Sequence, residues 1–245
     1  MKKLNYFSVG FDYDKEKNPV MSFDSQSHCI SEMYSGAFKP IVTKETSCID
    51  INCIPIGKKV DKSHHLDDIY RVYFENTFFD LNQFNDETDS SKKKIILELL
   101  HIGAMQACRD LGIDNTNFME AYEKVKELDY QNKYYYQKPK SSPNRKQKAQ
   151  ICIEHGLYKA DIHIVIFNKE GKIIKKELII SDSPNPAVFS QYLGKFKWLD
   201  NNNLILEHKQ RKGLVYKVEV NWKLELNTYW LFLNRKGSEQ HYFLN

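Results

Sequence analysis

The sequence predicts an α+β protein with a strand-rich N-terminal region, a central helical hairpin and a C-terminal antiparallel β meander. Between residues 90 and 128, apolar side chains recur every three to four positions, which is the period of a helix with one buried face. From residue 157 onward, short β-prone runs alternate with turn signals. The 245 residues are 41% hydrophobic, which allows one large domain or two smaller ones.

The first ninety residues favour strands with irregular connections. Residues 47–56 alternate apolar and polar side chains for part of their length, as a half-buried strand does. Residues 70–74 and 78–81 are aromatic and have a high β propensity. We therefore expect a strand in each of these three segments.

The strongest helical pattern covers residues 90–111. Ser90 or Ser91 is the expected N-cap, and Gly112 stands where a C-cap glycine belongs. Gly103 and its small neighbour Ala104 lie within the apolar stripe. They indicate that this helix approaches another element closely.

A second helix is expected at residues 117–128, capped by Asn115 or Thr116. Its apolar positions again follow a three- and four-residue spacing. Because residues 112–115 form a short connection, the two helices are predicted to make a hairpin.

A basic segment rich in tyrosine and lysine follows the hairpin. Residues 134–150 begin with three consecutive tyrosines, contain Pro139 and Pro143, and include no acidic residue. Such a composition is typical of a loop or linker. The predicted organisation is an α+β region (1–133), this loop (134–150) and an antiparallel β region (151–245), which can pack with the first region as one domain.

Turn signals divide the last region into successive strands. Short turns between consecutive strands favour antiparallel pairing. The expected strands are residues 158–167, 172–180, 187–198, 204–208, 214–220, 222–233 and 239–243.

The compartment is predicted from charge, hydropathy and cysteine usage. Charged residues follow the N-terminus too soon for a signal peptide, and no uncharged apolar run approaches the roughly 18 to 20 residues of a membrane helix. The five cysteines are widely spread and form no C-x-x-C pair, which favours reduced thiols. We therefore expect a cytoplasmic protein that does not enter a membrane.

No motif for catalysis or metal binding stands out. The adjacent pairs His28–Cys29 and His64–His65 do not predict a metal site, because neighbouring side chains diverge. Neither a phosphate-binding glycine loop nor a nucleophile elbow occurs. We therefore predict no catalytic, cofactor-binding or metal-ligating residue and no cofactor, and an enzyme of unrecognised type is kept as an alternative.

Two segments are candidates for contact with a partner. Residues 1–89 carry a net charge of −5, against +5 for residues 90–153 and +4 for residues 154–245. Carboxylates interleaved with phenylalanines suit a basic protein partner, whereas tyrosines next to lysines suit a protein or single-stranded nucleic acid. The candidate partner-binding residues are Glu75, Asp80, Asp86, Glu87, Tyr134, Tyr135 and Tyr136.

One family resemblance arises from packing motifs. The run Lys92–His101, its continuation to Asp114 and the Ala121–Tyr122 pair resemble bacterial immunity proteins that neutralise polymorphic or contact-dependent toxins. Residues 182–186 and 197–204 are similar to the meander of some such proteins. The resemblance implies stoichiometric inhibition of a cognate toxin by occlusion, without a cofactor, and it carries over no binding residue.

Two other functions compete with toxin neutralisation. A nucleic-acid-contacting protein or a phage counter-defence protein would use the basic segment that begins at Tyr134.

If the resemblance to immunity proteins holds, the acidic N-terminal third suits a basic toxin such as a nuclease. The oligomeric state is not predicted.

Overall fold

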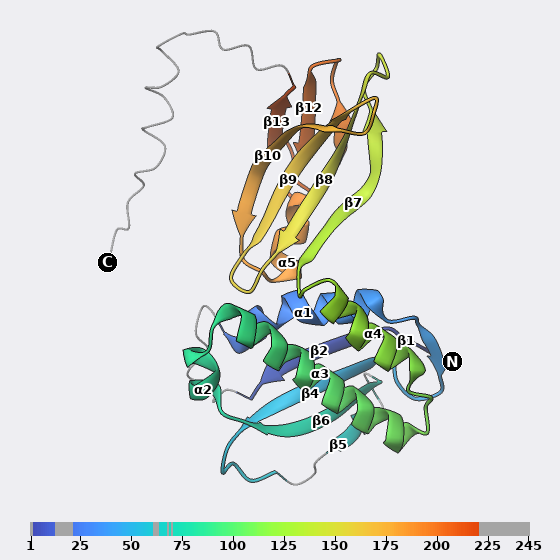
Figure 1. Ribbon diagram of the computed structural model, residues 1–245, viewed down its shortest axis with the longest axis vertical. Coiled ribbons are helices and arrows are strands. Elements are labelled where there is room, and N and C mark those ends of the chain that lie inside the picture. Colours follow the sequence, from blue (N-terminus) through green and yellow to red (C-terminus); the bar gives the residue numbers. More distant parts are fainter. Residues whose placement is uncertain (1, 13–21, 61–63, 68, 70, 221–245) are drawn as a thin grey trace.

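The computed structural model describes residues 2–12, 22–60, 64–67, 69 and 71–220, which form two parts stacked end to end (Figure 1). Helices and strands occur in both parts, so the predicted α+β class is confirmed. One hydrophobic core is formed by side chains of residues 4–130 together with Leu157, and a second by side chains of residues 134–220. Within the described residues, no helix is long and apolar enough to cross a membrane.

The first part is built on a four-stranded sheet in the order β2-β4-β6-β5. Strands β2, β4 and β6 are parallel, and β5 pairs antiparallel with β6 at one edge. A separate antiparallel ribbon joins β1 to β3. The strands are β1 (Lys2–Leu4), β2 (Tyr6–Phe11), β3 (Ile41–Thr43), β4 (Cys48–Pro55), β5 (His64–Asp67) and β6 (Val72–Phe79).

The expected strands of the first ninety residues are present, but the predicted boundary within residues 70–81 is wrong. Residues 72–79 form the single strand β6, and Leu81 already begins helix α2 (Leu81–Asp86). Asp80 ends the strand because its carboxylate accepts hydrogen bonds from the Asn82 and Gln83 amides at 3.0 Å. The side chain is therefore an N-cap.

Helix α1 (Phe23–Ala37) was not predicted from the sequence. Its interior contains serines, which favour caps and turns over helix interiors. Here they face the edge strand β2: Ser27 Oγ donates to the Val9 carbonyl at 2.6 Å, and Ser35 Oγ accepts from the Phe7 amide at 3.0 Å. Tertiary hydrogen bonds therefore outweigh the low helix propensity of this segment.

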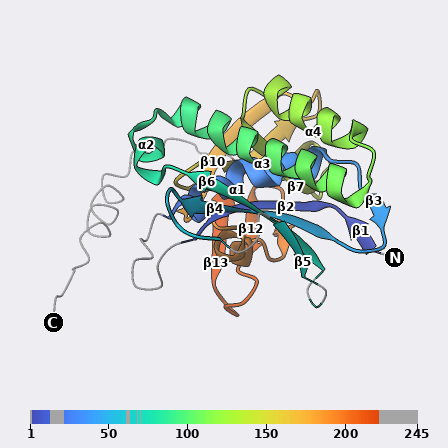
Figure 2. The ribbon, with the colours of Figure 1, turned by 90° about the horizontal axis from the view of Figure 1, so that it is seen from below.

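The predicted helical hairpin is confirmed as α3 (Asp89–Leu111) and α4 (Thr116–Glu127). Gly112 ends α3 in the left-handed conformation with φ of 62°, as expected of a C-cap glycine. The N-cap prediction is wrong, because Thr88 takes that place and its hydroxyl accepts from the Ser91 amide at 3.2 Å. Figure 2 shows α3 and α4 lying over one side of the sheet.

Close contact between α3 and the sheet depends on Gly103. A Cβ atom at this position would lie 2.3 Å from Ile51 Cγ1 on β4. The absence of a side chain therefore lets the helix axis approach the strands, as the sequence indicated. Helices α1, α3 and α4 share one core with Phe7, Ile49 and Ile51 of the sheet.

The second part is the predicted antiparallel meander, arranged as two sheets. Strands β7 to β10 form one sheet in sequence order, and β11 to β13 form the other. A short helix, α5 (Pro186–Phe189), and a 3-10 turn (Ser190–Tyr192) connect them. The strands are β7 (Asn132–Ser141), β8 (Gln147–His155), β9 (Ala160–Asn168), β10 (Ile173–Asp182), β11 (Phe196–Trp198), β12 (Asn203–Glu207) and β13 (Val215–Glu219).

Two secondary-structure predictions in this part are wrong. Residues 134–150 are mostly strand, because Tyr134 and Tyr136 alternate into the core and Pro139 is tolerated on the edge strand β7. Residues 187–198 are mostly not strand, because Asn185 caps a helix that has Pro186 at its first position. The expected strands at 222–233 and 239–243 lie outside the described residues.

Direct contacts join the two parts. Leu157, in the turn between β8 and β9, is 3% exposed and belongs to the core of the first part. Asn132 Nδ2 donates to the Cys29 carbonyl at 2.7 Å, and His155 Nδ1 lies 2.9 Å from Glu32 Oε2. The helical hairpin thus packs on the N-terminal strands, and the meander meets α1 through its own turn.

Candidate functional site

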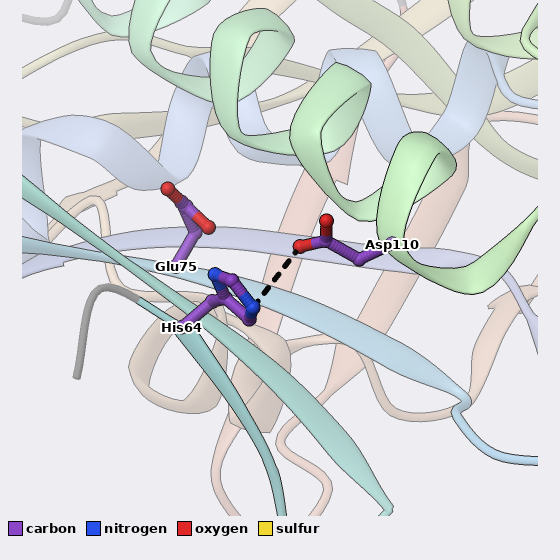
Figure 3. Close-up of side chains that lie close together, drawn as sticks. All are labelled: His64, Glu75 and Asp110. Carbon is purple, nitrogen blue, oxygen red and sulfur yellow. Dashed lines mark ion pairs between the residues drawn. The ribbon is translucent and has the colours of Figure 1, made fainter.

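Three ligand-type side chains converge at the edge of the first sheet: His64, Glu75 and Asp110 (Figure 3). One nitrogen or oxygen atom from each lies within 4.8 Å of the others. His64 Nε2 is 3.5 Å from Asp110 Oδ2, and the histidine side chain is 44% exposed. The group is open to solvent on the side of the edge strand β5.

The sheet register produces this arrangement. His64 on β5 pairs directly with Glu75 on β6, so their side chains share one face. Tyr73 lies two residues before Glu75 and faces the same way. Asp110 reaches the group from the last turn of α3, seven residues after Gly103, which is two helical turns along the same helix face. Sequence positions 46 residues apart thereby meet at one point.

Tyr73 connects the two carboxylates. Its hydroxyl lies 3.2 Å from Glu75 Oε2 and also hydrogen-bonds Asp110 Oδ2. A tyrosine hydroxyl carries one proton, so it donates to one carboxylate at a time. Burial raises the pKa of Glu75, and burial followed by the Asp110 hydrogen bond raises the pKa of Tyr73. Both shifts favour the protonated form of the group concerned.

Neighbouring groups hold Asp110 in place. Gln106 Nε2 donates to Asp110 Oδ1 at 2.9 Å, and Arg109 in turn donates to the Gln106 side-chain oxygen. The His64 ring stacks on the Tyr73 ring, with centroids 6.1 Å apart. The adjacent His65 points to the opposite face and stacks on Phe74 at 4.8 Å. Only one histidine of the pair therefore joins the cluster.

A second candidate surface is the face of β7–β10 that points away from α5 and β11–β13, called the outer face below. Strand register places Tyr135, Cys152, His163 and Leu178 in one row across all four strands. Tyr135 is 45% exposed and Leu178 is 51% exposed. Phe167 adds an aromatic ring, 6.1 Å from that of Tyr135. The outer face thus exposes apolar side chains on its two edge strands, while Cys152 between them is buried and the His163 side chain is 12% exposed.

An ionic group borders the apolar row. Glu154 lies 2.8 Å from Lys176 Nζ and 2.9 Å from Lys133 Nζ. Hydrogen bonds from Lys176 and Lys133 lower the pKa of Glu154 to about 2. His163 Nε2 is 3.2 Å from the other Glu154 oxygen, but burial lowers the pKa of this histidine. The carboxylate is therefore ionised at neutral pH and shared between two lysines.

The structure separates the residues predicted to bind a partner. Glu75 belongs to the cluster with His64, and Asp80 caps α2. Asp86 is exposed at the end of α2 and Glu87 is half-buried beside it. On β7, Tyr135 lies on the outer face, whereas Tyr134 and Tyr136 pack against the second core. These seven residues form no single surface, and the three tyrosines do not share one face of β7.

A further candidate site is a groove at the junction of the two parts. It has a volume of about 630 Å³ and lies between α1, α4 and the start of β7. Tyr6, Met33 and Leu128 contribute apolar surface, and Glu32 and Lys133 contribute charge. The groove is separate from the cluster and borders the outer face at Lys133, which pairs with Glu154.

The sequence matches no protein-family model, and neither a curated protein nor a solved structure is significantly similar to the chain. The fold defines an α+β protein. Its function is therefore inferred from the geometry of its candidate sites alone.

Proposed function

We propose that this chain is a non-catalytic binding protein that docks another protein on the outer face of β7–β10. The observation that carries the proposal is the row from Tyr135 to Leu178. A solvated face of an antiparallel sheet usually presents polar side chains. Here Tyr135 and Leu178 expose aromatic and aliphatic surface on the edge strands β7 and β10, and Glu154 forms its ion pairs from β8, between them. Protein interfaces commonly combine apolar surface, enriched in aromatic residues, with hydrogen-bonding and charged groups.

The composition of the outer face favours a protein over nucleic acid. Of three consecutive tyrosines, only Tyr135 is available there for stacking. Lys133 and Lys176 are held in ion pairs with Glu154, and Lys159 pairs with Asp161, so these lysines already have carboxylate partners and are not arranged for phosphates. Leu178 offers an aliphatic surface that bases do not require. A hydrophobic protein contact uses all of these apolar side chains.

Within this class, we propose an immunity protein that neutralises a cognate toxin by covering it. Inhibition of this kind needs a stable one-to-one contact and no chemistry by the inhibitor. The net charge of −5 on residues 1–89 would attract a basic toxin such as a nuclease over long range. The outer face would then supply the short-range contact. Because long-range attraction and short-range contact would come from different surfaces, the acidic residues and the apolar row need not be adjacent.

The docking surface is tested with two matched substitutions. Leu178→Lys places a charge in the apolar row, and Ile102→Lys makes the same change at an exposed position of α3, where the side chain is 60% exposed. Tagged full-length proteins are used to capture partners from the native host. We expect a stoichiometric partner with the wild type and with Ile102→Lys, and its loss with Leu178→Lys.

Equal capture by all three proteins would contradict the outer face as the docking surface. Recovery of single-stranded RNA or DNA in place of a protein would contradict protein binding. An additional variant, Asp86→Lys, tests whether the acidic residues at the end of α2 contact the partner. Loss of the partner with this variant alone would assign the contact to α2 instead.

Neutralisation is tested by growth. Expression of the captured protein alone should arrest growth, and co-expression of the wild-type chain should restore it. Leu178→Lys should fail to protect, while Ile102→Lys should protect fully. A captured protein that is harmless without the chain would contradict the immunity function and would leave the docking surface intact.

A further inference from the structure

We propose that His64, Glu75 and Asp110 form a binding site for one divalent transition-metal ion of the zinc type (Figure 3). The inference is independent of the docking surface, which lies in the other part of the molecule. It rests on the ligand chemistry, on the ligand spacing and on the support that surrounds the ligands.

The donor set fits a transition ion. Zinc accepts imidazole nitrogen and carboxylate oxygen, and sites with three protein ligands keep one position for water. Calcium and magnesium prefer more ligands and oxygen donors alone. One imidazole with two carboxylates therefore selects a zinc-type ion among the common divalent cations.

The spacing fits with small side-chain adjustments. Two ligand atoms on one tetrahedral ion, each at about 2.1 Å, lie roughly 3.4 Å from one another. His64 Nε2 and Asp110 Oδ2 are 3.5 Å apart. All three ligand atoms lie within 4.8 Å of one another, and a rotation of the Glu75 side chain closes the remaining gap. The backbone need not move, because the β5–β6 register already sets the ligands face to face.

The surrounding groups resemble an outer shell of a metal site. Gln106 donates to the Asp110 oxygen that does not face His64, at 2.9 Å. Tyr73 donates to a carboxylate of the cluster. Hydrogen bonds of this kind orient ligands and tune their basicity. Within the described residues, no lysine or arginine forms an ion pair with either carboxylate, and Arg109 donates to Gln106 instead.

The test is calorimetric titration of the reduced full-length chain with Zn²⁺ alone. We expect one ion per chain. His64→Ala should weaken binding by more than the roughly 10- to 100-fold that loss of an outer-shell partner causes, and Tyr73→Phe should weaken it by about 10-fold. His65→Ala is the matched control, since this exposed histidine lies on the same strand but faces away from the cluster. The His65→Ala protein should bind Zn²⁺ with the affinity of the wild type.

Titration with Co²⁺ identifies the donor atoms. A site of nitrogen and oxygen ligands gives visible ligand-field bands without the intense near-ultraviolet bands of thiolate ligands. Thiolate bands, no binding of one equivalent of Zn²⁺, or unchanged affinity in His64→Ala would each overturn the assignment. Asp110→Asn provides a second ligand variant. Should it fail to fold by circular dichroism, His64→Ala decides, because that side chain is 44% exposed.

Discussion

Replacing Gly103 by alanine tests the contact between α3 and the sheet. The added Cβ would lie 2.3 Å from Ile51 Cγ1 and 3.2 Å from its Cδ1. Ile51 is fully buried and β-branched, so its side chain has little freedom to move away. Overpacking of a core usually costs about 1–3 kcal/mol, and this overlap belongs at the upper end.

The helix itself gains from the same substitution. Alanine is favoured over glycine in a helix interior by about 1 kcal/mol, so the net loss of stability should be about 2 kcal/mol. For a chain of this size, this corresponds to a fall in melting temperature of about 4–8 °C. Thermal and urea unfolding followed by far-ultraviolet circular dichroism measure both quantities.

Two controls make the result specific. Gly36→Ala changes a helical glycine that has no atom within 4 Å of the added Cβ, and it should stabilise the protein by about 0.5 kcal/mol. In an Ile51→Ala background, Gly103→Ala should become neutral or favourable, because the clashing atoms are gone. A Gly103→Ala protein as stable as the wild type, with no coupling to Ile51, would refute the close approach of α3 to β4.

The remaining predictions concern the junction, one ionic group and the thiols. Asn132→Ala should lower the free energy of unfolding by about 0.5–1.5 kcal/mol, since it removes the hydrogen bond to Cys29; no loss in urea unfolding would argue against that contact. The pKa of Glu154 is lowered from 4.5 to about 2, so its stabilising contribution is complete above pH 4.5 and lost as the pH falls toward 2. Glu154→Gln should therefore be less stable than the wild type at pH 7 and equal to it near pH 2, and a difference independent of pH would contradict the pairing with Lys176 and Lys133. Burial raises the pKa of Cys29 and of Cys108 to about 12, so an alkylating reagent at pH 8 should label these thiols only after unfolding, as mass spectrometry can show. Rapid labelling of native Cys29 would contradict its burial.

The sequence was most informative where the local pattern and the tertiary environment agree. The α3–α4 hairpin was predicted within one residue at most boundaries, because its apolar stripe faces the core along its full length. Helix α1 was missed because its serines gain their favourable contacts from strand β2, and helix propensity takes no account of such contacts between elements. Strand β7 was taken for a loop because edge strands and loops share lysine and proline.

The candidate metal site shows a similar limit. The reasoning that His64 and His65 diverge was correct, and they do face opposite sides of the sheet. The partners of His64, however, come from β6 and from the end of α3, and no local spacing connects them. The only available signal was Tyr73 and Glu75 at positions two apart, which places both on one face of a strand. The pairing of β5 with β6, which completes the group, requires knowledge of the register.

The turn that carries Leu157 constrains how this protein can change over evolution. Leu157 belongs by sequence to the meander but fills a place in the core of the first part, and Tyr158 beside it donates to Asp89 at 2.8 Å. An exchange of the meander by recombination would leave that place vacant unless the incoming module brought an equivalent turn. The two parts are therefore expected to be inherited together, because the first core is complete only with the turn that the meander supplies.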